Sequence, residues 1–273
     1  MNLGGRETVL RHVLVAFDLS AHARAALEAA AALAARAGGE IEGLFVEDEE
    51  FLKLAGLPVA RFVDPGSAAP RPHSVAAMER ELRRLAEGAR RAIEEVARRT
   101  RVRWSFRVVR GPVSPTVLAG AVGADLVALG RSGYEAHAGR RLGSTARAIA
   151  RAAPMPVLLL RRGETVAPPI LVAYDGGEAA DRALDLAARL AGPEPVGVLL
   201  VPGERRDADV LRRRAEARLR VGGTTARVRV VEPPALADAV RDERGGVLLL
   251  PAAPGSSLAE RVDEVACPVL LVR

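Results

Sequence analysis

The sequence is poor in several residue types, and each shortage narrows what the protein can be. The chain of 273 residues has one cysteine, Cys267, so no intrachain disulfide can form and a reducing compartment is expected. Aromatic residues make up 3%, which leaves few platforms on which nucleic-acid bases could stack. No apolar run reaches the roughly 20 residues that span a membrane, and the opening MNLGGRETVLRH lacks the apolar stretch of a signal peptide. We therefore expect a cytoplasmic protein with no membrane insertion.

Lysine is also nearly absent, since Lys53 is the one lysine among 40 basic residues and arginine supplies the rest. The net charge of +6 is compatible with a polyanionic partner. However, the arginines alternate with Asp and Glu along the predicted helices, and Ala and Arg are abundant throughout, as GC-rich coding would produce. We expect no nucleic-acid binding. The hydrophobic fraction of 49% and the charged fraction of 27% are typical of one or two globular domains.

The chain contains an internal repeat. The segment HVLVAFDLSAHARAALEAAAALAARAGG aligns without a gap on PILVAYDGGEAADRALDLAARLAGPEP when Asp18 is placed on Asp175. The ends repeat as well, because PVLLLRR begins at Pro156 and PVLLVR at Pro268. The polar, proline-containing segment RRGETVAPP lies between the copies and is typical of a linker. We predict two domains in tandem, residues 1–163 and 164–273.

Strand and helix patterns alternate within each copy. In the first, apolar runs of strand length occupy residues 12–17, 41–46, 104–109, 125–130 and 156–160. Apolar residues at helical spacing fill the stretches between them, as from Met78 to Val96. This alternation predicts an α/β fold of two doubly wound, five-stranded parallel sheets of Rossmann-like type. In such sheets ligands bind at the carboxyl ends of the strands.

The stretch ALGRSGYEAHAGRRLGSTAR joins the fourth predicted strand to the next helix. Gly130 ends the strand, Gly133 lies in the following turn, and Gly143, Ser144 and Thr145 open the helix. Glycines allow close approach of the backbone, and a helix N-terminus offers N–H groups to an anion. The pattern is compatible with a phosphate site and equally with a tight turn followed by a helix cap.

Asp18 follows the first predicted strand, where doubly wound folds place carboxylates that face a ligand. It could accept hydrogen bonds from a ribose or from an adenine edge. It could also cap the next helix, a role that Ser20 can supply as well.

On these residues the chain resembles a tandem universal stress protein. The family's ATP-binding signature Gly-x2-Gly-x9-Gly-Ser/Thr is complete at Gly130, Gly133, Gly143 and Ser144. The resemblance implies bound ATP with Mg²⁺, its adenine against Val46 and near Asp18, and its phosphates along the loop. The implied cofactor-binding residues are Ala16, Phe17, Asp18, Val46, Leu129, Gly130, Arg131, Gly133, Arg141, Gly143, Ser144 and Thr145. Arg131 and Arg141 enter this set as guanidinium forks for phosphate, although each could instead belong to a solvated basic surface.

The second copy departs from the signature. Pro251 replaces the first glycine, and only four positions separate it from Gly255, where 13 separate Gly130 from Gly143. We predict that the second domain keeps the fold but does not bind ATP in the family's manner. The resemblance implies that the two last strands pair inside one chain as a pseudo-dimer. Cys267 lies just before the second of these strands, and we expect it to be buried and inert.

An ATP-binding regulatory protein of the stress response is the function that the resemblance implies, with a dimer of tandem chains or another protein as partner. A slow ATPase or an ATP-dependent modifying enzyme is the first alternative, although no catalytic residue and no metal cluster is assigned. A nucleotide-free scaffold is the second. It would apply if the first copy's insert at residues 47–76 fills the pocket, instead of forming a lid or a surface loop.

Overall fold

A computed structural model describes residues 10–50, 53, 61–62, 71–72, 75–133, 142–202, 207–244, 246–252 and 259–273. The first half, from β1 to β7, contains β1 (His12–Ala16), α1 (Ala21–Arg36), β2 (Glu40–Asp48), β3 (Arg61–Phe62), β4 (Arg71–Pro72), α3 (Val75–Thr100), β5 (Arg103–Gly111), α4 (Val113–Gly120), β6 (Leu126–Gly130), α5 (Ser144–Ala152) and β7 (Val157–Leu160). The second half, from β8 to β12, contains β8 (Ile170–Tyr174), α6 (Glu178–Ala191), β9 (Val196–Leu200), α7 (Ala208–Val221), β10 (Ala226–Val230), η1 (Pro233–Ala235), α8 (Leu236–Asp242), β11 (Val247–Pro251), η2 (Ala259–Asp263) and β12 (Val269–Val272).

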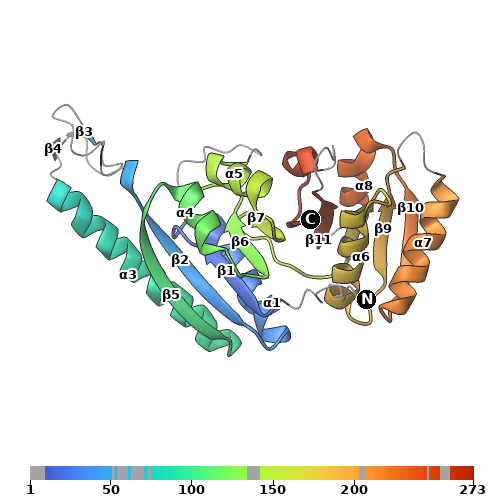
Figure 1. Ribbon diagram of the computed structural model, residues 1–273, viewed down its shortest axis with the longest axis horizontal. Helices are drawn as coiled ribbons and strands as arrows, with labels where there is room; N and C mark the ends of the chain where they lie inside the picture. The colour runs from blue at the N-terminus through green and yellow to red at the C-terminus, as the bar shows by residue number, and fades with distance from the viewer. Residues whose placement is uncertain are drawn as a thin grey trace, which may run out of the picture.

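Ten strands form one sheet in the order β10-β9-β8-β11-β12-β7-β6-β1-β2-β5 (Figure 1). Each half contributes five neighbouring strands that run parallel to one another. The two sets meet at β12 and β7, which pair antiparallel, with Leu270 opposite Leu158. This confirms the predicted fold class, and the pairing of the two PVLL segments inside one chain is the one that the pseudo-dimer requires.

The core lies in two layers, one on each face of the sheet. Helices α1, α3, α6 and α7 pack on one face, while α4, α5 and α8 pack on the other (Figure 1). Each layer draws buried residues from both halves, so the apolar core continues across the β12–β7 junction. The central strands are buried on both faces, which is why they read in the sequence as unbroken apolar runs.

The boundaries of the helices follow local chemistry. The Ser20 hydroxyl accepts a hydrogen bond from the Ala23 N–H at 3.1 Å and caps α1, as its position after the first strand predicts. Eight of the sixteen α1 residues are buried, and six of these are alanines, which allow the helix to lie close to the sheet. On α3 the expected apolar stripe is buried at positions that include Met78, Leu82, Ile93 and Val96.

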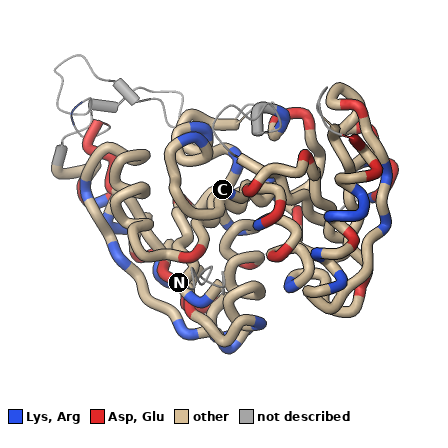
Figure 2. Tube along the Cα trace, turned by 45° about the vertical axis from the view of Figure 1, so that its right-hand side comes forward, with Lys and Arg blue, Asp and Glu red and all other residues tan. Residues whose placement is uncertain are grey.

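Basic and acidic side chains alternate along the elements of both halves (Figure 2). Many form ion pairs at the surface, such as Arg218 with Asp185 and Arg110 with Glu47. Among the residues described, no helix is both long and apolar enough to cross a membrane. Most of the insert at 47–76 lies outside the described residues, which there include both ends of the insert and the short antiparallel pair β3 and β4.

Candidate functional site

A pocket of about 720 Å³ opens at the carboxyl ends of β1, β2 and β6. In this sheet β1 lies between β6 and β2. The chain continues from β1 to β2 and β5 on one side, and then crosses to β6 and β7 on the other side. The loops after these strands diverge at that point, which is where open α/β sheets hold ligands. Val113 and Val117 of α4 form another part of the wall.

Asp18 is one of the charged residues that line the pocket. Its Oδ1 accepts a hydrogen bond from the Ser20 N–H at 2.9 Å, which fixes the turn between β1 and α1. Because Ser20 caps the helix, Asp18 is not needed for that role. The exposed Asp18 carboxylate keeps Oδ2 beside Gly133, where a Cβ on the glycine would lie only 2.9 Å away. The Asp18 carboxylate therefore forms one surface with the start of the segment from Gly130 to Gly143, called the glycine loop below.

Gly130 is required by close packing between β6 and α1. A Cβ at this position would lie 2.7 Å from the His22 Cβ and 2.8 Å from the Ala23 nitrogen. Both atoms belong to the first turn of α1, so a side chain at 130 would push that helix away from the sheet. The glycine thus sets the distance between the strand that carries the loop and the helix that follows Asp18.

The N-terminus of α5 also lines the pocket. Gly143 is the N-cap residue, and no side chain caps the helix there. The Gly143 N–H donates to the Arg131 carbonyl at 2.8 Å, which closes the base of the loop. The next N–H groups, from Ser144 onward, begin a helix and have no partner within it. Such N–H groups, with the positive end of the helix dipole, bind anions.

The pocket brings together ten of the twelve residues that the resemblance implied. They are Ala16, Phe17, Asp18, Val46, Leu129, Gly130, Gly133, Gly143, Ser144 and Thr145. Arg141 lies outside the described residues. The remaining residue, Arg131, is placed differently from the expectation.

The expectation that Arg131 forks a phosphate is corrected by its contacts. The side chain is 2% exposed and points into the second half. Its Nη1 donates to the carbonyls of Val262 and Val265, at 3.0 and 2.9 Å, and its Nη2 donates to the Cys267 carbonyl. Burial, followed by the charge of Arg161, lowers the pKa of the guanidinium to about 10, which leaves it protonated at neutral pH. A guanidinium engaged in this way cannot also bind a ligand in the pocket.

Several lining residues escaped the sequence reasoning. Asp48 lies on β2 two residues after Val46, and it brings a second carboxylate to the pocket. The alternation of side chains along a strand could have indicated it, because residues 46 and 48 share one face. Ser132 also lines the pocket from within the glycine loop. Val117 of α4 belongs to a short helix whose contribution depends on tertiary packing.

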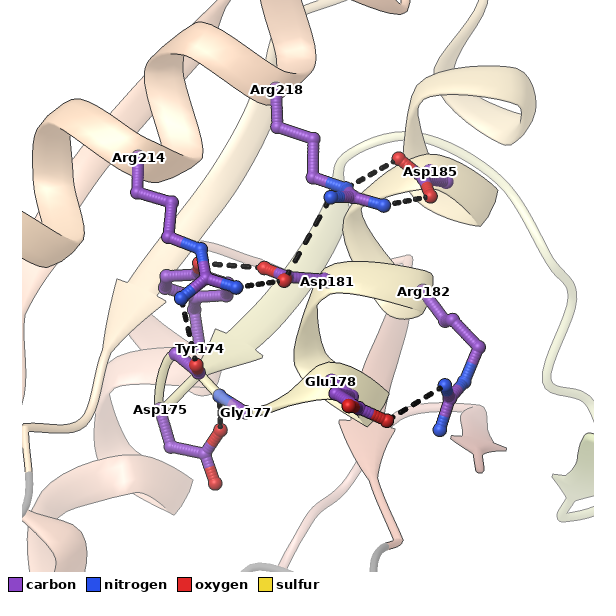
Figure 3. Close-up of polar contacts among 10 residues, drawn as sticks. Tyr174, Asp175, Gly177, Glu178, Asp181, Arg182, Asp185, Arg214 and Arg218 are labelled. Carbon is purple, nitrogen blue, oxygen red and sulfur yellow. Dashed lines mark hydrogen bonds and ion pairs between the residues drawn. The ribbon is translucent and has the colours of Figure 1, made fainter. Parts of the chain in front are cut away.

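In the second half, the region that corresponds to the first turn of the pocket holds a dense polar network (Figure 3). The Tyr174 hydroxyl donates to Asp181 Oδ1 at 2.8 Å, and Arg214 binds Oδ2 of the same carboxylate. Arg214 also donates to the Gly176 carbonyl at 3.3 Å. Asp175, the counterpart of Asp18, accepts from the Gly177 N–H at 2.8 Å. The turn that follows β8 is thus tied to α6 and α7.

The element after β11 also differs from its counterpart. In the first half β6 ends at Gly130 and leads to the nine-residue helix α5. In the second half β11 ends at Pro251 and the chain forms the five-residue 3-10 helix η2 before β12. Pro251 has no N–H to offer a ligand. Gly255 and Ser256 lie outside the described residues.

The model of the Universal stress protein family matches residues 10–161, which is more than half of the chain. No curated protein matches the chain significantly.

Solved structures with this fold include two that match nearly the whole chain. A universal stress protein from Archaeoglobus fulgidus DSM 4304 is 18% identical, covers 97% of this chain and 96% of its own, and has a TM-score of 0.70. A functionally unknown protein from Pseudomonas aeruginosa PAO1 is 17% identical, covers 97% of this chain and 93% of its own, and has a TM-score of 0.56. At these identities the likeness concerns the fold alone, over nearly the whole chain.

Proposed function

Since the chain belongs to the universal stress protein family, we propose that it is a regulatory protein of the stress response that binds ATP in the pocket of its first half. One observation carries the proposal. A single pocket surface joins the Asp18 carboxylate, the apolar end of β2 and the uncapped N-terminus of α5. These are the kinds of group that the ribose, the base and the phosphate chain of ATP require.

The base would lie against Val46 and Leu129, where the strand ends supply an apolar surface. Asp18 Oδ2 faces the pocket while Oδ1 stays with Ser20, so one oxygen remains available to a ribose hydroxyl or to the base edge. The phosphates would receive hydrogen bonds from the first N–H groups of α5 and from the hydroxyls of Ser144 and Thr145.

Magnesium is expected to accompany the nucleotide. Among the described lining residues, Asp18 and Asp48 are charged and no Lys or Arg is present. A triphosphate beside two carboxylates requires a cation, and Mg²⁺ bound to the phosphates supplies one. The ion would be held mainly by the phosphates, with the Ser144 and Thr145 hydroxyls as neighbouring oxygen donors.

We assign the role to binding and not to turnover. Hydrolysis needs a group that orients a water molecule and further charge stabilisation at the leaving phosphate. Within the described pocket the carboxylates are those of Asp18 and Asp48, and Asp18 Oδ1 is already held by the Ser20 N–H. Phosphate release slower than about one per second would agree with this assignment, whereas multiple turnovers in the usual enzyme range would contradict it.

The binding test is calorimetric titration of Mg-ATP into the wild-type chain and into a Gly143→Glu, Ser144→Glu variant. Two carboxylates at the N-terminus of α5 should repel the phosphates and abolish measurable binding. The matched control is Ser256→Glu at the corresponding sequence position of the second half, which should bind as the wild type does. Equal affinity of the wild type and the double variant would overturn the site, and two ATP molecules per chain would overturn the restriction to the first half.

A further inference from the structure

Both ends of the glycine loop rest on one short segment of the second half. The first end is Arg131, which follows Gly130 directly. Its buried guanidinium donates to the carbonyls of Val262, which lies in η2, and of Val265 and Cys267, which lie between η2 and β12. The last carbonyls of a helix have no partner within it, so the guanidinium satisfies groups that this buried segment would otherwise leave unpaired.

The second end of the loop is Leu142, immediately before Gly143. Its N–H donates to Oδ1 of Asp263, the last residue of η2, at 2.7 Å. Arg147 of α5 strengthens the same corner, because it donates to the Leu142 carbonyl at 3.3 Å and lies 3.8 Å from the Asp263 carboxylate. A residue of the second half therefore fixes the backbone at the position where α5 begins.

The two ends are also joined to each other, since the Gly143 N–H donates to the Arg131 carbonyl. The base of the loop is thus a small frame of three connections, one within the first half and two to the segment that contains η2 and the residues directly after it. The orientation of this frame sets the direction in which the N–H groups of Ser144 and Thr145 point. Binding groups need to be held to a fraction of an ångström, usually by residues that do not contact the ligand.

The position of η2 in the topology corresponds to that of α5. It lies between β11 and β12, as α5 lies between β6 and β7, so η2 is the second half's counterpart of the helix that lines the pocket. We propose that η2 acts as the support of the first half's phosphate-binding end, with Asp263 and Arg131 as positioning residues, so that nucleotide binding and the docking of η2 are coupled. The identity of the ligand rests on the proposed function, whereas the support itself does not.

Asp263 is the residue that tests the proposal, because it contacts the backbone of the loop and does not line the pocket. Asp263→Ala removes the acceptor, and Asp263→Asn keeps an oxygen in its place. Glu264→Gln is the matched control, since Glu264 is the next residue and pairs with Arg261 inside the second half. The full chain is used throughout. Neither Asp263 nor Glu264 belongs to the β12–β7 pairing, and Asp263→Ser is a second truncation if Asp263→Ala does not fold.

Two measurements are made on each variant: hydrogen exchange of the Leu142 amide without ligand, and Mg-ATP affinity by calorimetry. A hydrogen bond to a charged acceptor typically changes an equilibrium by about tenfold or more. We expect Asp263→Ala to speed exchange at Leu142 and to weaken Mg-ATP binding by about that factor, with Asp263→Asn recovering most of both and Glu264→Gln matching the wild type.

The outcomes separate the two proposals. Wild-type affinity for Mg-ATP in Asp263→Ala, despite faster exchange at Leu142, overturns the positioning role. Unchanged exchange at Leu142 overturns the support itself. If the wild-type chain binds no Mg-ATP, the proposed function fails, and the exchange data still decide whether η2 holds the loop: faster exchange in Asp263→Ala supports it and equal exchange overturns it.

Discussion

The Arg131 guanidinium donates a hydrogen bond to the Cys267 carbonyl and thereby joins the end of β6 to the approach of β12. The residues are 136 positions apart in the sequence, and both are buried. This contact lies where the two halves of the ten-stranded sheet meet, close to the antiparallel pair of β7 and β12. It makes the cysteine a native reporter of how firmly the halves are docked.

Arg131→Met should loosen this junction. The methionine keeps the unbranched stem of the side chain but ends before the guanidinium, so it leaves the carbonyls of Val262, Val265 and Cys267 without their donor. Each buried acceptor that loses its charged donor costs up to about 3 kcal/mol. Removal of the buried charge offsets part of this cost, so we expect the free energy of unfolding to fall by about 2–4 kcal/mol. Urea unfolding measures the loss, and the labelling of Cys267 by a thiol reagent should become at least several-fold faster.

Arg147→Met is the control for this prediction. Arg147 lies on the neighbouring helix α5 and is 45% exposed, so its ion pair with Asp263 is worth less than about 1 kcal/mol. Labelling of Cys267 should stay close to the wild-type rate. If Arg131→Met labels no faster than Arg147→Met, the guanidinium does not hold the junction closed.

The stability of the protein should fall at alkaline pH because of Cys267. Burial is the main cause that raises the pKa of its thiol to about 12, while Arg131 opposes the shift. A thiol in the unfolded chain ionises near pH 8.5, so between about pH 9 and 12 the folded state holds a proton that the unfolded state has released. The free energy of unfolding therefore decreases as pH rises, by up to about 1.4 kcal/mol per pH unit from this group.

Urea unfolding of the wild type and of Cys267→Ala at pH 8, 9 and 10 checks the effect. The variant should be less stable at pH 8 but should lose less stability on going to pH 10. Burial and the bond to Asp181 also raise the pKa of Tyr174, but this contribution is common to both proteins and cancels in the comparison. Parallel pH profiles of the two proteins would contradict the assignment.

Much of the fold could be predicted because its signals are local. Unbroken apolar runs predicted the central strands, a three-four stripe predicted α3, and Ser20 predicted the start of α1. The repeat placed two copies in the chain, and the resemblance supplied the pairing of β7 with β12. The glycine spacing indicated the pocket because glycine is the residue that allows close approach. A Cβ at Gly130 would clash with α1, and a Cβ at Gly133 would lie too close to Asp18.

The rest depended on contacts that no local pattern encodes. Arg131 looked like a phosphate ligand because it follows Gly130, yet its acceptors lie more than 130 residues away. Leu19 adopts a φ of 68°, a conformation that costs a leucine about 1 kcal/mol or more. The aligned residue in the second copy is Gly176, with a φ of 77°. The glycine indicates a left-handed backbone at this position, but the leucine of the first copy gives no sign of it, so only a comparison of the two copies could have predicted it.

Tyr174→Phe should destabilise the second half by about 1–2 kcal/mol. Phenylalanine fits this position, because Phe17 occupies the aligned position of the first half. The variant therefore removes the hydroxyl and little else. Asp181, which is 7% exposed, would lose one of its donors while Arg214 and Arg218 remain, and a buried acceptor that loses a neutral donor costs about that amount. Thermal or urea unfolding provides the measurement.

Asp185→Asn is the comparison for this network. Its carboxylate pairs with Arg218 but is 44% exposed, so the expected loss is below about 1 kcal/mol. A loss from Asp185→Asn that equals or exceeds the loss from Tyr174→Phe would mean that burial does not set the strength of these contacts.

Two of the pocket's glycines, Gly130 and Gly143, should respond differently to substitution by alanine. Gly130→Ala places a Cβ 2.7–2.9 Å from backbone and Cβ atoms of the first turn of α1, which must move away. Overpacking of this kind costs about 1–3 kcal/mol. At Gly143 the nearest atom to an added Cβ is 3.5 Å away, and φ and ψ of −61° and 162° suit any residue. The free energy of unfolding of Gly143→Ala should therefore lie within about 0.5 kcal/mol of the wild-type value.

Nucleotide binding then distinguishes a structural glycine from one that gives the ligand room. At Gly143 a methyl group would stand on the pocket wall beside the first N–H groups of α5, so Gly143→Ala should weaken Mg-ATP binding in a chain of normal stability. Gly130→Ala should weaken binding only together with a loss of stability, since it acts by displacing α1. If Gly143→Ala binds Mg-ATP as tightly as the wild type, the phosphates do not pass close to this residue, and the pose along the N-terminus of α5 has to be abandoned.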